Sequence, residues 1–309
     1  MSSQSKNISK RTVLITGGSG LVGTELSKIL EIEGHTVLHL SRSVAGTEAY
    51  KTYQWDIDQR FIEEEAITRA DSIIHLAGAS VAGAKWTEAY KNAIYDSRIN
   101  STRLLREKVE ALNPDLSYFL CASAIGIYGL DSGDQWMTEQ SERGEGFLAD
   151  VVEDWEKEAD KFSSLDIATG KLRIGVVLSN KGGALEKIVQ PIKLYAGAAL
   201  GSGNQYLSWI HIHDLCYILA FMLNANSVGV FNGVAPDPKT NSDFTKTAAK
   251  VLNKPLWLPN VPKFALNLLV GEMAELVLGG NRVSATKIRD SGFQFKYPEL
   301  ELALQELLK

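Results

Sequence analysis

The residues with the clearest chemistry are three glycines, Gly17, Gly20 and Gly23, spaced three apart near the start of the chain. Glycine lets the backbone turn sharply and lets a pyrophosphate approach without a Cβ in its path. A β-prone run precedes the glycines and an amphipathic segment follows them, so we expect a strand, a turn and a helix start whose N–H groups bind phosphate. A glycine-rich turn without a ligand is the alternative. The predicted dinucleotide-binding residues here are Gly17, Ser19, Gly20, Leu21, Val22 and Gly23.

The end of the expected second strand, 36–40, indicates which dinucleotide binds. An acidic residue about twenty positions after the glycine turn would hold the ribose hydroxyls and favour NAD. Ser41 and Arg42 stand there instead, and a hydroxyl with a guanidinium suits a 2′-phosphate, so NADP(H) is the predicted cofactor. The alternative for Arg42 is an exposed loop residue. Asp56 either contacts the adenine amino group or belongs to a plain turn.

Small and polar residues end the next two expected strands, 72–77 and 117–123. Small side chains after the first leave room for adenine and ribose, whereas His75 is expected to be a core histidine rather than a catalyst. The Ser123 hydroxyl, at the carboxyl end of the second, is expected to point into the crevice where α/β enzymes place substrate. The further residues assigned to the cofactor site are Ala77, Gly78, Ala79, Arg98, Ala122 and Gly175.

Alternating strand and helix signals must position these residues. They predict an α/β fold, a doubly wound (Rossmann) parallel sheet with a smaller C-terminal α/β substrate domain. We expect a disordered tail over 1–10, a dinucleotide-binding domain over 11–178 with return segments near 207–232, and a substrate or cap domain over 179–206 and 233–309. The expected strands are 13–16, 36–40, 52–55, 72–77, 117–123, 171–178, 207–210 and 228–232, and the expected helices are 21–33, 87–112, 146–163, 184–195 and 215–223, the last capped by Asp214.

The bulk composition excludes several classes of protein. The 309 residues carry a net charge of -5 without a Lys/Arg cluster, which argues against nucleic acid as a partner. The apolar stretch 264–278 is interrupted by Glu272 and Glu275, so we expect no membrane span. Cys121 and Cys216 lie in apolar runs and are expected to be buried free thiols, which suits a reducing cytoplasm. The expected partner is a small-molecule substrate, which the sequence does not identify.

The chain resembles the extended short-chain dehydrogenase/reductase superfamily, and within it the atypical "epimerase family" branch of NAD-dependent epimerase/dehydratase-like proteins, formerly labelled cell-division inhibitors, with a C-terminal domain of unknown function. The resemblance covers roughly residues 11–308 and implies an NADP-type cofactor and a C-terminal substrate domain, and relatives suggest homodimers through two long helices. The motifs that carry it are the Gly17–Gly23 turn, Leu76-Ala-Gly78, Lys85-Trp86-Thr87, Ser123-Ala-x-Gly-x-Tyr-Gly129, Trp155-Glu156, Arg173-x-Gly-Val-Val-Leu178, Gly201-Ser-Gly-x-Gln205, Trp209-Ile-His-Ile-x-Asp214, Asn232-Gly-Val-Ala-Pro236, Gly279-Gly and Ser291-Gly-Phe293.

The main departure from the superfamily concerns acid/base catalysis. Its usual proton carrier is a tyrosine followed four residues later by a lysine, and none of the ten tyrosines here has that lysine. Aligned on Glu156, the two positions hold Leu148 and Val152, which cannot move a proton. The polar groups that could replace them are, in order, Ser123, Tyr128 and Lys85, with Asp150 as a further candidate.

Two readings of function therefore stay open. One is an NADP-dependent oxidoreductase or epimerase with a nonstandard acid/base; the other is a non-catalytic NADP(H)-binding sensor or scaffold. Lys85 also reads as an ordinary solvated loop lysine. His211 and His213 would share one side of a strand, but a third convergent ligand is not evident, so strand-end packing is expected and no metal is assigned.

Overall fold

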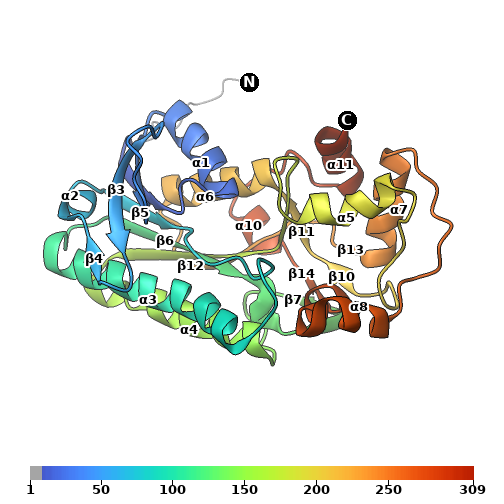
Figure 1. Ribbon diagram of the computed structural model, residues 1–309. Coiled ribbons are helices and arrows are strands. Elements are labelled where there is room, and N and C mark those ends of the chain that lie inside the picture. The colour runs from blue at the N-terminus through green and yellow to red at the C-terminus, as the bar shows by residue number, and fades with distance from the viewer. Residues whose placement is uncertain (1–8) are drawn as a thin grey trace, which may run out of the picture.

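The computed structural model describes residues 9–309, apart from the side chains of residues 269 and 270. Its centre is an eight-stranded sheet in the order β12-β8-β6-β5-β1-β2-β3-β4, in which every neighbouring pair is parallel except β3 with β4 (Figure 1). The order changes direction between β1 and β5, which is the switch point of a doubly wound fold. The strands of this sheet are β1 (Thr12–Thr16), β2 (Thr36–Ser41), β3 (Lys51–Asp56), β4 (Phe61–Ile62), β5 (Ser72–His75), β6 (Tyr118–Ala124), β8 (Ala168–Ile174) and β12 (Gly229–Gly233).

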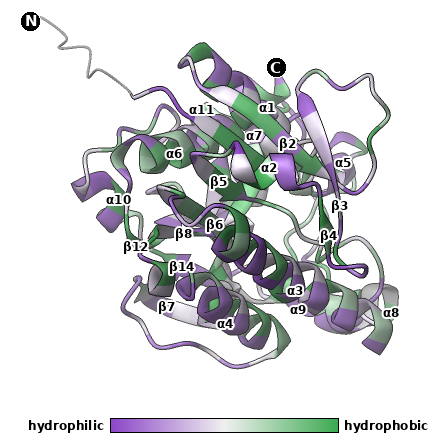
Figure 2. Cartoon of the chain, turned by 90° about the vertical axis from the view of Figure 1, so that its left-hand side faces the viewer, coloured by the Kyte–Doolittle hydropathy of each residue, from purple (hydrophilic) through white to green (hydrophobic). Residues whose placement is uncertain are grey.

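Helices cover both faces of this sheet. On one face α1 (Leu21–Ile32) and α6 (Ile212–Ala225) pack together over β1, β5 and β6. On the other lie α2 (Glu64–Thr68), α3 (Glu88–Leu112) and α4 (Phe147–Asp160). Every residue of β5 is buried, because a strand covered on both faces has no solvated side. Figure 2 shows the resulting pattern, with hydrophobic central strands and mixed outer helices.

Several of the remaining elements form a second body beside the sheet (Figure 1). Its own core gathers α5 (Ala184–Lys193), α7 (Asn241–Val251) and α11 (Leu300–Leu308) around Trp209. Another part of the C-terminal region joins the first core instead, since Val283, Ile288 and Phe293 belong to the cluster under α1 and α6. The other elements are β7 (Asp131–Met137), β9 (Val176–Leu178), β10 (Tyr206–Leu207), β11 (Trp209–His211), β13 (Lys239–Thr240), α8 (Lys263–Val270), α9 (Glu275–Leu278), β14 (Gly280–Val283), α10 (Thr286–Asp290) and the 3-10 turns η1 (Ile125–Tyr128), η2 (Ser163–Leu165) and η3 (Gly271–Ala274).

The predicted fold class is confirmed, and both cysteines are buried and free. The prediction of a single strand over 171–178 is wrong. The chain leaves the main sheet at Gly175 and continues as β9, which pairs with β11. A Cβ at Gly175 would lie 2.3 Å from the Ser208 carbonyl oxygen, so glycine is required where the two segments meet. The strand expected over 207–210 is likewise divided, into β10 and β11, and β4, α2 and β7 were not expected.

The predicted N-cap role of Asp214 is also wrong. His211 caps α6, its Nδ1 accepting from the His213 N–H at 3.1 Å. The Asp214 carboxylate lies in the first turn and accepts from the backbone N–H groups of Lys296 and Tyr297 at 3.0 and 2.8 Å. It therefore fastens the C-terminal segment to the sheet domain. His211 ends a strand and His213 lies in a helix, so the strand alternation expected for this pair does not apply.

Two further expectations concern the N-terminal tail and the absence of a membrane-spanning helix. Residues 1–8 of the expected tail lie outside the described residues. Within 9–309, none of the helices is both long enough and apolar enough to cross a membrane.

Candidate functional site

A cavity of about 410 Å³ opens at the switch point, where the carboxyl ends of β1, β2, β3 and β5 meet. Parallel α/β sheets bind ligands at this edge. Eight of the predicted cofactor residues are brought together here: Gly17, Ser19, Gly20, Ser41, Arg42, Ala77, Gly78 and Ala79. The lining is completed by Leu40, Ser43, Trp55, Ile57, Leu76 and Ser97, which the sequence analysis did not assign.

The glycine turn leaves its backbone open toward this cavity. Gly17 has φ +71°, and a Cβ there would lie 3.1 Å from the Ala77 nitrogen, so a side chain would collide with the backbone that follows β5. A Cβ on Gly23 would come within 2.3 Å of the Gly17 carbonyl oxygen, which identifies Gly23 as a packing residue of α1. Gly20 caps α1 without a side-chain hydrogen bond. The first turn of α1 thus presents N–H groups in the way that phosphate binding requires.

Buried hydrogen bonds through His75 hold the cavity wall opposite the glycine turn. Thr16 Oγ1 accepts from the backbone N–H groups of Leu76 and Ala77 at 3.1 Å and lies 2.7 Å from His75 Nδ1. The Thr16 hydroxyl therefore donates to Nδ1, which assigns the ring proton to Nε2, 3.1 Å from Ser101 Oγ. Burial, with a smaller effect of the Arg98 charge, lowers the pKa of His75 from 6.5 to about 3. His75 is a neutral core residue, as expected.

Two arginines give the site its charge. Arg42 is the sole charged side chain among the described residues that line the cavity. Arg98 lies behind Gly78, where a Cβ would be 3.2 Å from its guanidinium carbon, and it stacks over Trp155 at 5.2 Å. Burial lowers the pKa of Arg98 to about 10, and no described carboxylate pairs with it. The site is therefore electropositive and suits an anion.

The other predicted cofactor residues do not line the cavity. Leu21 and Val22 begin α1 beside it. Asp56 accepts from the Gln59 N–H at 2.9 Å, which is the turn contact kept as its alternative. Ala122 is buried within β6, and Gly175 serves the strand change described above.

The residues predicted as proton carriers occupy a buried polar chain at the end of β6. The Ser123 hydroxyl donates to Glu156 at 2.5 Å, and Arg173 holds both oxygens of that carboxylate at 2.8 Å. Arg173 also donates to the Tyr128 hydroxyl at 3.1 Å, which in turn donates to Asn232 at 2.7 Å. The Ser123 hydroxyl thus points to Glu156 rather than into the crevice.

The electrostatics of this polar chain oppose proton release. Burial, despite Arg173, raises the pKa of Tyr128. Burial acts to lower the pKa of Arg173, but its hydrogen bonds to Glu156 and the charge of that carboxylate raise it above its ordinary value. The two positions of the missing tyrosine and lysine hold the apolar side chains of Leu148 and Val152. These lie 3.4 and 3.9 Å from where a Gly126 Cβ would be, and neither can transfer a proton.

Lys85 lies apart from this polar chain. It is exposed on the loop between β5 and α3. Its solvated-loop alternative and its catalytic role are both compatible with this position.

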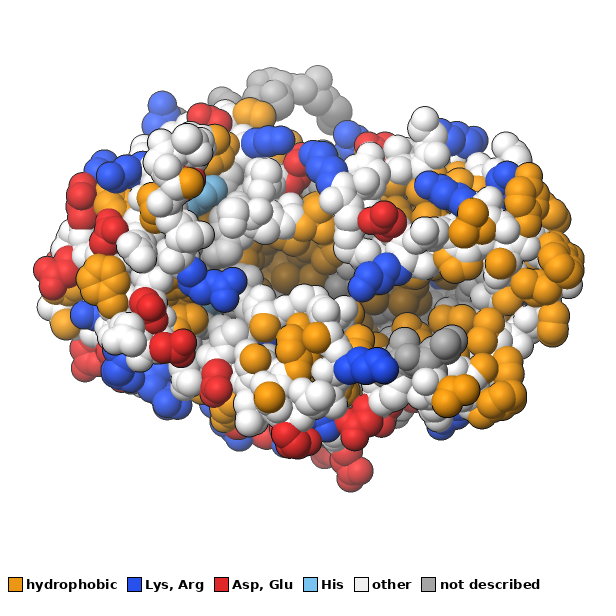
Figure 3. All heavy atoms as spheres, viewed as in Figure 1, with side chains coloured by type: hydrophobic (Ala, Val, Ile, Leu, Met, Phe, Trp, Pro, Cys, Tyr) orange, Lys and Arg blue, Asp and Glu red, His pale blue; other side chains and the backbone are white. Residues whose placement is uncertain are grey.

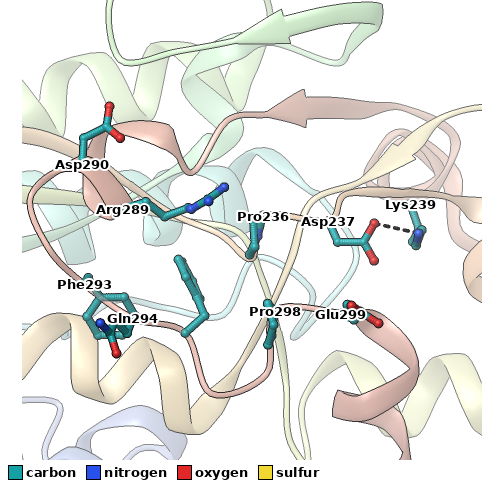
Figure 4. Close-up of a pocket in the computed structure, with 10 residues that line it drawn as sticks. Pro236, Asp237, Lys239, Arg289, Asp290, Phe293, Gln294, Pro298 and Glu299 are labelled. Atoms are coloured by element: carbon teal, nitrogen blue, oxygen red, sulfur yellow. Dashed lines mark ion pairs between the residues drawn. The ribbon is translucent and has the colours of Figure 1, made fainter.

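Sequence reasoning noted Glu156 only as part of a motif and missed its pairing with Arg173. A signal was present, since Arg173 stands in an apolar strand, where a charge needs a partner. The same reasoning missed a hollow of about 760 Å³ between 236–239 and 289–299 (Figure 4). That hollow shares no residue with the cavity, and its Asp237 and Lys239 pair with each other at 2.6 Å. No described His, Cys, Asp and Glu residues cluster as a metal site.

Known sequences match nearly the whole length of the chain. Residues 13–146 match the NAD dependent epimerase/dehydratase family, and residues 261–307 match a domain of unknown function, DUF1731. The Epimerase family protein YfhF of Bacillus subtilis is 38% identical over 96% of this chain and 97% of its own length. The Epimerase family protein SA0724 of Staphylococcus aureus is 36% identical over 96% and 98%.

Solved structures share the whole architecture. The human epimerase family protein SDR39U1 (isoform 2), determined with NADPH, superposes with a TM-score of 0.85 at 29% identity and covers 96% of this chain and 98% of that one. A nucleoside-diphosphate sugar epimerase from Corynebacterium glutamicum gives 0.79 at 31% identity, over 97% of this chain and 58% of that one.

Proposed function

The chain belongs to the epimerase family of NAD(P)-binding proteins, and from that premise we propose that it binds NADP(H) in preference to NAD(H) and acts as an oxidoreductase or epimerase on a small molecule. The preference for NADP(H) rests on the residues at the end of β2. Ser41 and Arg42 border the cavity there, and no carboxylate is found among its described lining residues. A guanidinium can pair with a 2′-phosphate, whereas a ribose diol would call for an acidic side chain.

The residues present fit such a cofactor. The open turn at Gly17 and Gly20 would hold the pyrophosphate, Ala77 and Gly78 would leave room for the ribose and base, and Arg98 would add positive charge behind them. The NADPH found in the human relative supports the same preference. The cofactor would supply the hydride, while the chain binds and orients it and excludes water.

The cofactor preference is tested by calorimetry of NADPH and NADH with the parent protein and with Arg42→Ala. A charge-assisted contact of about 1.5–3 kcal/mol predicts that the variant loses roughly tenfold or more of the preference. Arg60→Ala removes an exposed arginine that pairs with Glu107 away from the cavity and serves as the control. Equal affinities of the parent for NADPH and NADH would refute the proposal.

A second candidate function is cofactor binding without catalysis. Leu148 and Val152 favour it, because a missing acid/base costs about 10²–10⁴-fold in rate. We predict negligible turnover of simple alcohols, ketones and UDP-sugars with NADPH. Where turnover of another carbonyl or nucleotide-sugar substrate is found, Ser123→Ala, Tyr128→Phe and Lys85→Ala test the three candidate proton carriers one by one, and a large loss of turnover in one variant would identify the carrier. Rapid epimerisation of a common nucleotide sugar would show that the tyrosine and lysine are dispensable, and turnover indifferent to all three variants would show that the proton route lies elsewhere.

A further inference from the structure

A group of exposed apolar side chains, the apolar patch, lies on the C-terminal body, on the side away from the sheet (Figure 1). Of the six most exposed large apolar side chains among residues 9–309, four come from the end of α5, the loop between α7 and α8, and α8 itself. These four are Leu194, Trp257, Phe264 and Leu268, with exposed fractions of 69, 68, 75 and 85%. Figure 3 shows hydrophobic side chains gathered along this edge of the molecule, at the right of the view. Single exposed apolar side chains are ordinary, whereas a group of them indicates an interaction surface.

The two segments that supply the apolar patch are held side by side. Leu200 and Val261 form a parallel β-bridge, and Val261 stands directly before the start of α8. Closer to the patch, Lys254 Nζ donates to the Tyr195 hydroxyl at 2.7 Å and lies 4.0 Å from the centre of the tyrosine ring. The patch is therefore one surface built from two segments of the chain rather than a set of separate loop tips.

Lysines accompany the apolar patch. The two segments that supply it, 187–213 and 244–271, contain six lysines and no Asp, Glu or Arg, although the whole chain carries a net charge of -5. Two of the six lie on α7 and pair with carboxylates. Lys193 and Lys263 directly precede Leu194 and Phe264 in the chain, and Lys254 contacts Tyr195 as described above. Positive charge is thus concentrated at the patch of an otherwise acidic protein.

The kinds of apolar residue in the patch are those found where proteins meet lipid. Phe264 and Leu268 are four residues apart, so they lie on one face of α8, and that face is turned to solvent instead of to the core. Trp257 and Tyr195 carry amphipathic rings, which are enriched at membrane–water interfaces. Lysine side chains can lie along apolar surface and keep their charge among the headgroups. This combination is typical of a surface that lies in the interface of a membrane.

The charge of the patch also distinguishes a membrane from a second copy of the chain. In a two-fold dimer through the patch, Lys193, Lys254 and Lys263 of one copy would lie near the same lysines of the other, and like charges repel. An anionic lipid surface attracts each lysine, while its acyl region accepts the apolar side chains. Charge complementarity therefore favours lipid as the occupant.

We propose that the apolar patch binds the surface of a membrane that contains anionic phospholipids, with Trp257, Phe264 and Leu268 inserted at the level of the headgroups. The attachment is peripheral, since none of the described helices could cross a membrane. The cofactor cavity shares no residue with the patch, so a bound membrane leaves that cavity open. The proposal does not rest on the proposed function.

The test uses the intact protein and co-sedimentation with two kinds of vesicle, phosphatidylcholine alone and an equal mixture of phosphatidylcholine and phosphatidylserine. A lysine near an anionic surface contributes about fivefold in affinity (~1 kcal/mol), so three lysines predict at least tenfold tighter binding to the mixed vesicles. Raising the salt concentration from about 0.1 M to about 1 M should remove most of this difference, because the screening length falls from ~10 Å to ~3 Å. Equal binding to the two kinds of vesicle, or binding to neither, would overturn the proposal.

Exposed substitutions locate the contact without disturbing the core. The double variant Phe264→Ser with Leu268→Ser should lose at least tenfold in affinity for the mixed vesicles, because it removes two apolar side chains from the interface, and it should keep its NADPH affinity. Ile32→Ser, which changes an 83% exposed side chain at the end of α1 in the sheet domain, is the matched control and should bind as the parent does. Undiminished vesicle binding by the double variant would overturn the proposal.

A charge reversal tests the electrostatic part. Lys193→Glu is the cleanest choice, because Lys254 bonds to Tyr195 and Lys263 lines a hollow together with two glutamates. This variant should lose at least fivefold in affinity for the mixed vesicles and little for phosphatidylcholine alone. Equal losses on the two kinds of vesicle would contradict a role for the lysine charge.

Sedimentation velocity without lipid tests the second copy as the occupant. If the patch binds lipid, the parent and the double variant Phe264→Ser with Leu268→Ser have the same oligomeric state. A dimer of the parent that the double variant dissociates would overturn the proposal and identify the patch as an interface between copies of the chain.

Discussion

Two regions at the same edge of the sheet differ in whether their polar groups have partners within the protein. At the ends of β1, β2 and β5, the glycine turn and Arg42 line a cavity, and Arg98 lies behind Gly78. Neither arginine forms an ion pair with described residues. At the end of β6, Ser123, Glu156, Arg173 and Tyr128 bond to one another and are buried. Groups left unpaired are available to a ligand, whereas groups that satisfy each other hold the fold together. The comparison explains how cofactor binding can persist where the usual proton carriers are gone.

The largest effect is expected from Glu156→Ala, which breaks the buried polar chain. It would leave Arg173 buried without its carboxylate, and removing one partner of a buried ion pair costs about 3–5 kcal/mol. Chemical denaturation measures the loss. Glu153→Ala, on the same helix but in an exposed pair with Arg143, should change the stability much less. Similar losses for the two variants would erase the distinction between the regions.

Gly20→Val should close the cofactor region and leave the fold intact. Gly20 has an ordinary φ of -75°, and its Cβ would meet only the Gly17 carbonyl oxygen, at 3.2 Å, so the branched side chain extends into the cavity rather than straining the backbone. Blocking two charge-assisted phosphate contacts predicts about a 100-fold or greater loss of NADPH affinity. Gly23→Ala should instead lower stability, because its Cβ would lie 2.3 Å from the same oxygen. Normal NADPH binding by Gly20→Val would place the cofactor elsewhere.

The smallest effect concerns His75, which supports the cavity wall between the two regions. Its folded-state pKa of about 3 lies below the unfolded value of 6.5, so the folded state binds fewer protons. The stability from this group is complete above about pH 6.5 and is lost as the pH falls toward 3, by up to about 1.4 kcal/mol per unit. Denaturation midpoints between pH 7 and 4.5 should fall more steeply for the parent than for His75→Gln. Parallel curves would mean that the ring is not held neutral.

The sequence by itself determined the elements and the cofactor turn. Glycine spacing, strand alternation and the absence of an acidic residue after β2 are local properties, and most of the strands and long helices lie within a few residues of their expected ranges. The loss of the tyrosine and lysine could also be read from spacing alone.

Only the tertiary structure decided which polar groups face a ligand. The sequence assigned Asp214 to a helix cap, Ser123 to the crevice and Gly175 to the cofactor site. Each instead meets a partner far away in the chain: the 296–297 backbone, Glu156 and the Ser208 carbonyl. The Tyr195 hydroxyl likewise finds its donor in Lys254, 59 residues distant. Hydrogen-bond satisfaction is a property of neighbours in space, so a sequence shows which groups need partners but not which ones find them.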